Sequence, residues 1–262
     1  MNAAEIGIGA RPLTISERAR EQFLAAGRRP LFLGNWERAL FIHYEADPEM
    51  LQRQIPFELD LRECSAFVSA VAFSMRRLRP SFGGKLAERL LRPIANHEFL
   101  NVRTYVRHNG RPGIYFLAEW VNNRVSLLLG PGTYGLPYRF GRIAYQHHHE
   151  REILAGQVGN SFSYSASLPS AACFEACQPG SLEEFLLERY SAFTHHSGTC
   201  RLFDIWHEPW PQCPVDAQVS DKLLSVTGPW FEKARQIGAN YSPGVRDIWM
   251  GAPRRIRLSR PK

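Results

Sequence analysis

The stretch from residue 99 to residue 129 gives the clearest β-strand signal in the chain, because Val102, Thr104 and Val106 alternate with Arg103, Tyr105 and Arg107. The segment His108-Asn-Gly-Arg111 is a hairpin turn, and Ile114–Trp120 is the returning strand. An Asn-Gly pair favours a tight hairpin turn because both central residues of that turn need positive φ. The pattern therefore predicts a β-hairpin with Arg103 and Tyr105 on one face of its first strand.

Other apolar runs are too short for buried helices and are bounded by turn residues. The run from Cys64 to Met75 is small and aliphatic on both faces, which is typical of a central strand. Further strands are predicted over residues 31–44, and a second hairpin over residues 142–168 with its turn near residues 156–160. Most of the chain between residues 31 and 168 is thus expected to form antiparallel strands.

Helix starts are marked by capping residues. Thr14-Ile-Ser-Glu17 and Ser181-Leu-Glu-Glu184 have the spacing of a capping box. Asp47-Pro48 places an N-cap before a proline at the first helical position. These signals, with one amphipathic segment, predict short helices over residues 14–26, 48–54, 85–91 and 181–193. Few short helices and many strands indicate the α+β class.

Composition narrows the range of functions. A chain of 262 residues that is 44% hydrophobic has enough apolar surface for one core. The net charge of +7 is scattered among acidic residues except in the basic tail Arg254–Lys262, which we expect to be a solvated end. We therefore expect no nucleic-acid partner, and the sequence leaves an oligomer open.

The cellular compartment follows from three weak features. Five cysteines form an odd set without the regular spacing of a disulfide scaffold, which favours a reducing environment. The longest apolar run, Ala66–Phe73, is far below the roughly 20 residues that a membrane helix needs. The N-terminus has no continuous apolar core of a signal peptide. These features predict a cytoplasmic protein with no membrane partner.

Several short motifs occur in a fixed order along the chain. Together they resemble the YqjF-like family of bacterial domains of unknown function, which is structurally related to acetoacetate decarboxylase. The resemblance covers residues 31–252. It is carried by Asn101-Val-Arg-Thr-Tyr105, Tyr134-Gly-Leu-Pro-Tyr-Arg139, the Phe185–Tyr190 segment, His207-Glu-Pro-Trp210 and Tyr241-Ser-Pro-Gly244.

The resemblance implies a curved, barrel-like antiparallel sheet that encloses a cavity, with helices packed outside. It divides the chain into an N-terminal extension with a short helix (residues 1–30), a single domain (31–252) and a basic tail (253–262).

The resemblance also bears on chemistry. In decarboxylases of this fold a Gly-Xaa-Pro-Lys turn supplies the lysine that forms an imine with a keto acid. Here Gly135-Leu136-Pro137 is followed by Tyr138, and a phenol cannot form an imine. The glutamate of those enzymes would fall near residues 101–103, where this chain has no acid. None of the four lysines lies near the turn in sequence: Lys85, Lys222, Lys233 and Lys262. We therefore expect the fold without lysine-imine chemistry.

The candidate ligand-binding residues lie around this turn and on the predicted hairpin. They are Arg103, Tyr105, Glu119, Tyr138 and Arg139. An arginine directed into a cavity suits a carboxylate because its planar donors bind two oxygens at once. Of the adjacent pair Tyr138 and Arg139, we expect Tyr138 to point inward, with Arg103 or a water as its partner. The alternative for Arg103 is a structural ion pair with Glu119 across the sheet.

Two functions remain open at this stage. One is a protein that binds, and perhaps transforms, a small organic acid in an internal cavity, and any enzyme activity would be lyase-like. The other is a non-catalytic binding or interaction module.

Metals and cofactors are not expected. His147-His148-His149 can direct at most two rings to one face, and Cys173 and Cys177 have no second Cys/His pair. No phosphate loop and no Gly-Xaa-Ser-Xaa-Gly elbow is present in the sequence.

Overall fold

The computed structural model describes residues 11–25 and 27–258. Its strands form one 14-stranded sheet within these residues. They are β1 (Phe32–Ala46), β2 (Glu58–Leu59), β3 (Ala66–Pro80), β4 (His97–His108), β5 (Arg111–Val121), β6 (Tyr138–Phe140), β7 (Ile143–His148), β8 (Ile153–Val158), β9 (Phe162–Ser167), β10 (Ser191–His196), β11 (Thr199–Trp206), β12 (Cys213–Ser220), β13 (Arg235–Met250) and β14 (Arg254–Ile256).

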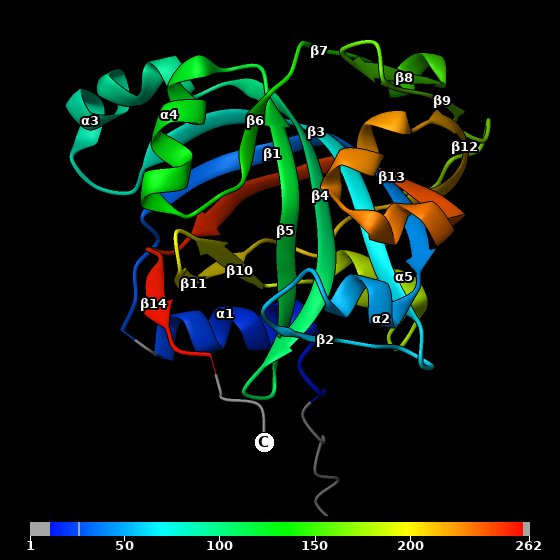
Figure 1. Cartoon of the computed structure of the whole chain (residues 1–262). Coiled ribbons are helices and arrows are strands. Elements are labelled where there is room, and N and C mark those ends of the chain that lie inside the picture. The colour runs from blue at the N-terminus through cyan, green and yellow to red at the C-terminus, as the bar shows by residue number, and fades with distance from the viewer. Residues whose placement is uncertain (1–10, 26, 259–262) are drawn as a thin grey trace, which may run out of the picture.

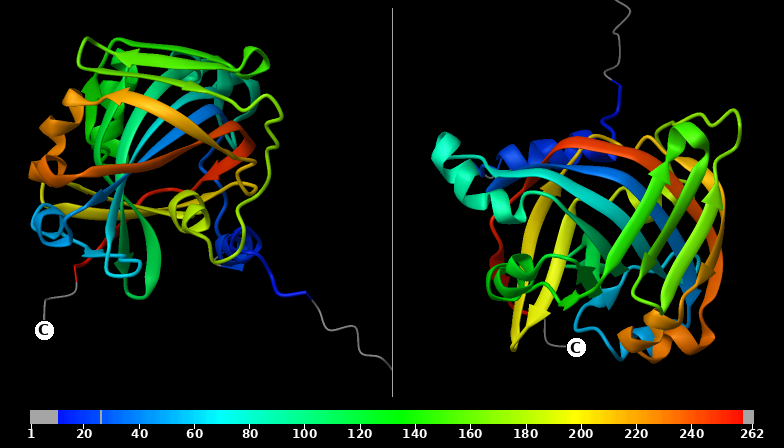
Figure 2. Two further views of the ribbon diagram at one scale, coloured as in Figure 1. Left: turned by 90° about the vertical axis from the view of Figure 1, so that its right-hand side faces the viewer. Right: turned by 90° about the horizontal axis from the view of Figure 1, so that it is seen from above.

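The sheet curves until it meets itself (Figures 1 and 2). Its order is β14-β11-β10-β5-β4-β3-β1-β13-β12-β9-β8-β7, and β11 also pairs with β13 through Ile205↔Met250 and Trp206↔Trp249. Seven strands from β11 to β13 are therefore joined in a closed circuit. Most neighbours are antiparallel, as predicted, but β5 is parallel to both β10 and β6, so the sheet is mixed.

The central hairpin forms as its sequence predicts. Asn109 and Gly110 have φ of 51° and 75° between β4 and β5, which is the conformation that the Asn-Gly pair favours. The second predicted hairpin is instead a three-stranded meander, β7 to β9, with Gly159 at positive φ after β8.

Five α-helices are described, most of them outside the sheet: α1 (Ile15–Ala25), α2 (Pro48–Gln52), α3 (Gly84–Leu91), α4 (Arg124–Thr133) and α5 (Leu182–Leu187). The remaining helical turns are η1 (Arg92–Ile94), η2 (His149–Arg151), η3 (Lys222–Thr227) and η4 (Pro229–Lys233). The α1 capping box is complete, because Thr14 and Glu17 each bond the other's backbone N–H. The predicted fourth helix was too long, since α5 ends at Leu187 and residues 191–196 form β10.

The first and last described elements pack onto the sheet. Helix α1 lies across one end of the molecule (Figure 1). There Phe23 is buried against Trp249, and Ser16 Oγ donates to the His207 carbonyl. Strand β14 pairs with β11, so residues 254–256 of the basic tail belong to the sheet. Residues 259–262 lie outside the described residues.

Candidate functional site

An internal cavity of about 300 Å³ lies between the inner face of the sheet and helix α4. Its walls are mostly apolar and come from β1, β3, β4, β5, β11, α4 and the end of β13. The lining reaches the surface at α4, where Leu129 is 45% exposed. The aromatic part of the wall is formed by Phe32, Trp36, Phe41, Phe73, Phe99, Phe116, Phe203 and Trp210.

A row of polar side chains crosses three neighbouring strands at this cavity. Asn101 on β4 lies opposite Glu119 on β5, and Glu119 lies opposite Tyr138 on β6. The Asn101 amide donates from Nδ2 to Glu119 Oε1 at 2.9 Å, whereas Glu119 Oε2 has no hydrogen-bond partner. All three side chains line the cavity. The row is local in origin, because it follows from the register of one hairpin and the turn that leads into β6.

Glu119 is 4% exposed and sits in an apolar surrounding. Burial raises the pKa of its carboxyl to about 8, against a smaller lowering by the Asn101 hydrogen bond and the Arg103 charge. At neutral pH the carboxyl is therefore protonated. A protonated Oε2 can donate a hydrogen bond into the cavity, which an ionised carboxylate cannot do.

Arg103 lies two residues beyond Asn101 on the same strand and also lines the cavity. One of its Nη atoms donates to the Leu186 carbonyl at 3.2 Å, and its guanidinium lies over the Phe41 ring at 5.6 Å. Its Nε is buried without a partner. No ion pair joins Arg103 to Glu119 in the described part of the chain: Glu119 lies opposite Asn101, and Arg103 lies opposite Phe116 after a bulge at Val102. The cavity thus holds a cation whose charge no carboxylate side chain in contact neutralises.

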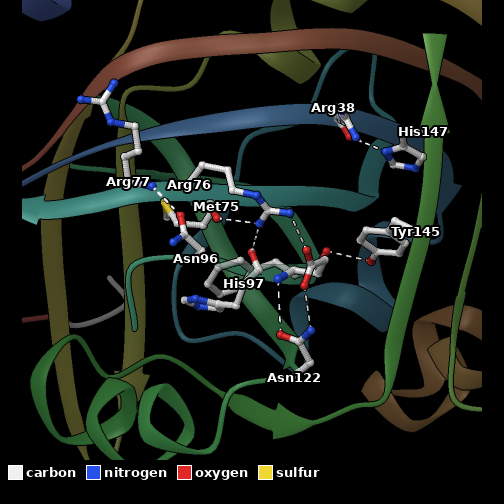
Figure 3. Close-up of polar contacts among 11 residues, drawn as sticks. Arg38, Met75, Arg76, Arg77, Asn96, His97, Asn122, Tyr145 and His147 are labelled. Atoms are coloured by element: carbon white, nitrogen blue, oxygen red, sulfur yellow. Dashed lines mark hydrogen bonds and ion pairs between the residues drawn. The ribbon is translucent and has the colours of Figure 1, made fainter. Parts of the chain in front are cut away.

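His97 lies on β4, four residues before Asn101, and lines the cavity near α4. Its ring nitrogens lack a well-formed hydrogen bond, although a backbone contact at Ile94 favours the protonated form. Burial lowers the pKa of His97 to about 4, so the ring is neutral at pH 7. Its neighbour Glu98 points to the other face of the strand, where its carboxylate accepts hydrogen bonds from Arg76 at 2.6 Å and from Asn122 at 2.7 Å. Figure 3 shows Arg76 and Asn122 beside His97.

Tyr138 is held by close packing beneath α4. A Cβ atom added at Gly130 would collide with the Tyr138 ring, so only glycine fits at that position of the helix. The ring also lies 6.0 Å from that of Phe99. Burial raises the pKa of the Tyr138 hydroxyl well above its usual value. No direct hydrogen bond joins Tyr138 to Arg103 among the described residues, and the expected alternative, a water between them, stays a prediction.

Unpartnered buried polar atoms gather at this cavity. They are Trp36 Nε1, the ring nitrogens of His97, Asn101 Oδ1, Arg103 Nε and Glu119 Oε2, and all five residues line it. Only Arg189 and Arg201 contribute such atoms elsewhere in the described residues. Buried polar groups in folded proteins are nearly always hydrogen-bonded. Unbonded donors and acceptors that face one cavity therefore mark a place for a polar ligand group or ordered water.

The other two candidate residues lie outside the cavity. Tyr105 is on the cavity face of β4 but is buried beneath α5, where its hydroxyl contacts Ser69 at 2.6 Å and donates to the Leu186 carbonyl at 2.9 Å. Arg139 is exposed and lies over Trp120, because adjacent residues of an extended segment point to opposite faces. The candidates that the fold brings together at the cavity are Arg103, Glu119 and Tyr138.

Neither a lysine nor a group of metal ligands lies at the cavity within the described chain. Lys85, Lys222 and Lys233 are exposed, and none lines the cavity. Lys262 lies outside the described residues. No group of three or more His, Cys, Asp or Glu residues is arranged to hold a metal ion in residues 11–25 and 27–258. His147 is buried and bonds the Arg38 carbonyl and the Tyr164 hydroxyl.

Solved structures with this architecture define the class of fold. The acetoacetate decarboxylase of Legionella pneumophila matches with a TM-score of 0.59 and 14% identity over 97% of this chain and 94% of that one. An acetoacetate decarboxylase-like enzyme from Sphingomonas wittichii RW1 matches with a TM-score of 0.59 and 16% identity over 88% and 95%. The enduracididine biosynthesis enzyme MppR, in complex with pyruvate, matches with a TM-score of 0.58 and 15% identity over 88% and 92%. The chain therefore has the acetoacetate decarboxylase-like fold.

The sequence places it more narrowly. Residues 34–246 match the DUF2071 family, described as an uncharacterized conserved protein, and the chain belongs to this family. It is also 28% identical over 190 residues to the uncharacterized protein YqjF of Bacillus subtilis strain 168, across 71% of this chain and 76% of that protein. The predicted family and fold class are confirmed. No described helix is both long and apolar enough to cross a membrane.

Proposed function

We propose that this protein binds a small organic acid in the cavity and holds the carboxylate between Arg103 and Glu119. The observation that carries the proposal is the set of unbonded donors at this point. Arg103 Nε has no partner, and Glu119 Oε2 carries a proton at neutral pH. A carboxylate accepts hydrogen bonds from both and compensates the buried cation, which an uncharged ligand cannot do. The complex of MppR with pyruvate is an example of a keto acid bound within this fold.

Arg103→Gln is expected to weaken the binding of carboxylates at least tenfold, because a hydrogen bond to a charged group contributes roughly 1.5–3 kcal/mol. A panel of 2-oxo, 2-hydroxy and simple carboxylic acids should raise the melting temperature of the wild-type protein by mass action. Arg139→Gln is the matched control, since Arg139 lies on β6, on the other side of β5 from β4, and is exposed. If no acid shifts the wild-type melting temperature, or if both variants respond alike, the proposal is wrong.

The chemistry at this site does not use a lysine imine. Tyr138 stands at the position where the resemblance places the lysine, and the described lysines are exposed outside the cavity. Incubation with pyruvate or acetoacetate and sodium borohydride is therefore expected to leave the mass of the intact protein unchanged. A reduced adduct that peptide mapping assigns to Lys85, Lys222 or Lys233 would restore imine chemistry.

The second candidate is a binding module without catalysis. The replacement of the lysine by Tyr138 favours it, since a fold can keep its cavity after its chemistry is lost. Binding alone does not separate the two candidates. A proton-transferring role of Glu119 would separate catalysis from binding alone. Glu119→Gln tests this role, because the amide keeps the hydrogen bonds and cannot release a proton.

A further inference from the structure

Four polar side chains of the cavity adjoin one another on its wall, and the neutral His97 ring and Trp36 Nε1 are further unbonded polar groups of the lining. Asn101, Arg103 and Glu119 come from neighbouring positions on β4 and β5, and Tyr138 adjoins them on β6. Most of the rest of the wall consists of aromatic and aliphatic side chains such as Phe73, Phe99, Phe203 and Met250. A ligand that fits this cavity has one polar end and an apolar body.

The volume sets the size of that body. A cavity of about 300 Å³ has room for roughly ten water molecules at about 30 Å³ each. A three-carbon keto acid has only about six non-hydrogen atoms, so most of the apolar wall would face a void or water. A void loses dispersion contacts, and water at an apolar wall lacks hydrogen-bond partners. Small acids therefore use the polar end and leave most of the wall without contacts.

The direction in which the apolar body of the ligand extends follows from the place where the cavity lining reaches the protein surface. Leu129 and Thr133 on α4 are exposed and line the cavity, whereas Arg103 is 9% exposed beneath Leu186 of α5. The carboxylate end is thus enclosed and the α4 end is open. An acid whose carboxylate lies at Arg103 extends its body toward α4.

We infer that the ligand is a carboxylic acid with an aromatic or branched apolar body, of about the size of 3-phenylpropionate, rather than a keto acid of pyruvate size. The inference rests on the proposed function, because it takes the carboxylate at Arg103 as given. It names the class of acid for that site. Phe73, Phe99 and Phe203 would contact the apolar body, and α4 would cover its far end.

An affinity series on the full chain tests the inference. Calorimetric titration with acetate, butyrate, hexanoate, 3-phenylpropionate and pyruvate is expected to show affinity rising about fourfold for each buried CH₂. We expect 3-phenylpropionate to bind at least a hundredfold more tightly than pyruvate. The uncharged 3-phenylpropanamide, which has the same body, should bind at least tenfold more weakly than the acid.

Adjacent leucines of α4 give a matched pair of variants. Leu129 lines the cavity, whereas Leu128 is 80% exposed and does not. Leu129→Trp narrows the open end and is expected to weaken 3-phenylpropionate at least tenfold while acetate binding stays within twofold. Leu128→Trp should change neither. Both positions are on the surface of the helix, so both variants should fold, which their melting temperatures check.

The outcomes distinguish a failure of this inference from a failure of the proposed function. Equal affinity for pyruvate and 3-phenylpropionate would overturn the inference and leave the proposed function standing. No binding of any acid, or equal binding of the acid and its amide, would overturn the proposed function itself. Equal loss of acetate and 3-phenylpropionate in Leu129→Trp would show that the body does not extend toward α4, which also contradicts the inference.

Discussion

Acidification from pH 6.5 to pH 4.5 is expected to lower the free energy of unfolding by about 5 kcal/mol. A loss of this size is comparable to the whole stability of many domains, which is roughly 5–15 kcal/mol. We therefore expect the protein to lose much of its stability by pH 4.5. The cause is a set of buried neutral histidines.

Burial lowers the pKa of four histidines in the folded protein. The pKa falls to about 3 for His43 and to about 4 for His97, His147 and His207. In the unfolded chain each has a pKa near 6.5, so unfolding takes up about two protons at pH 6.5 and between three and four protons near pH 5.5. A pKa that is depressed by folding means stability that is present at high pH and lost as the pH falls.

Two buried carboxyls oppose this effect. Burial raises the pKa of Glu119 to about 8 and of Glu188 to about 7, so both are protonated in the folded state and ionised in the unfolded state at pH 5–6. They release about two protons on unfolding, which leaves a net uptake of about two. One proton corresponds to about 1.36 kcal/mol per pH unit, so the expected slope is about 2.7 kcal/mol per unit.

Urea titrations at pH 4.5, 5.5 and 6.5, followed by tryptophan fluorescence, measure this slope. His97→Gln should reduce it to about 1.4 kcal/mol per unit because one buried histidine is removed. His195→Gln is the matched control, since His195 is exposed in the folded state and should leave the slope unchanged. A stability that stays constant between pH 4.5 and pH 6.5 would contradict the account.

The part of the site that follows from the sequence is the part that depends on local signals. The Asn-Gly turn fixes the β4–β5 hairpin, and the alternation along β4 places Arg103 on an inner face. The same alternation extended backward reaches Phe99 and His97, so these lining residues could have been found by counting in steps of two. Asn101 belongs to the same series of alternate residues along β4.

The remaining features depend on contacts between distant segments. Arg103 and Tyr105 share a face of β4, but only the fold shows that α5 covers Tyr105. The prediction of β structure as far as residue 129 was wrong, because α4 begins at Arg124 and Asn123 caps its start through the N–H groups of Val125 and Ser126. The end of this helix was missed because Gly130, Pro131 and Gly132 resemble a loop. The closure through β11 and β13, and the parallel pairings of β5, join segments that no local pattern connects.

Replacing Glu119 by glutamine is expected to stabilise the protein by about 4 kcal/mol at pH 8 and by little at pH 4.5. The folded carboxyl stays protonated up to a pKa of about 8, whereas the unfolded one ionises near 4.5. Stability is therefore lost as the pH rises between these values. Glutamine keeps an acceptor for Asn101 and carries no charge at any pH, so this loss disappears. Urea titrations of both proteins at pH 5 and pH 8 measure the difference, and an equal stability at pH 8 would contradict the raised pKa.

The same substitution changes how ligand binding depends on pH. In the wild-type protein about nine-tenths of the Glu119 carboxyls are ionised at pH 9, so an acid that needs the protonated form is expected to bind about tenfold more weakly than at pH 7. The positive charge of Arg103 favours this ionisation, because it lowers the pKa of Glu119 against the larger raising effect of burial. Glu119→Gln should bind 3-phenylpropionate equally at pH 7 and pH 9, because its amide N–H donates at both. Glu98→Gln is the control: it replaces a carboxyl that is bonded to Arg76 and Asn122 and does not line the cavity, so it should keep the wild-type pH dependence. Parallel pH profiles for the wild type and Glu119→Gln would show that Glu119 does not contact the acid, and the carboxylate would then have to be assigned to Arg103 alone.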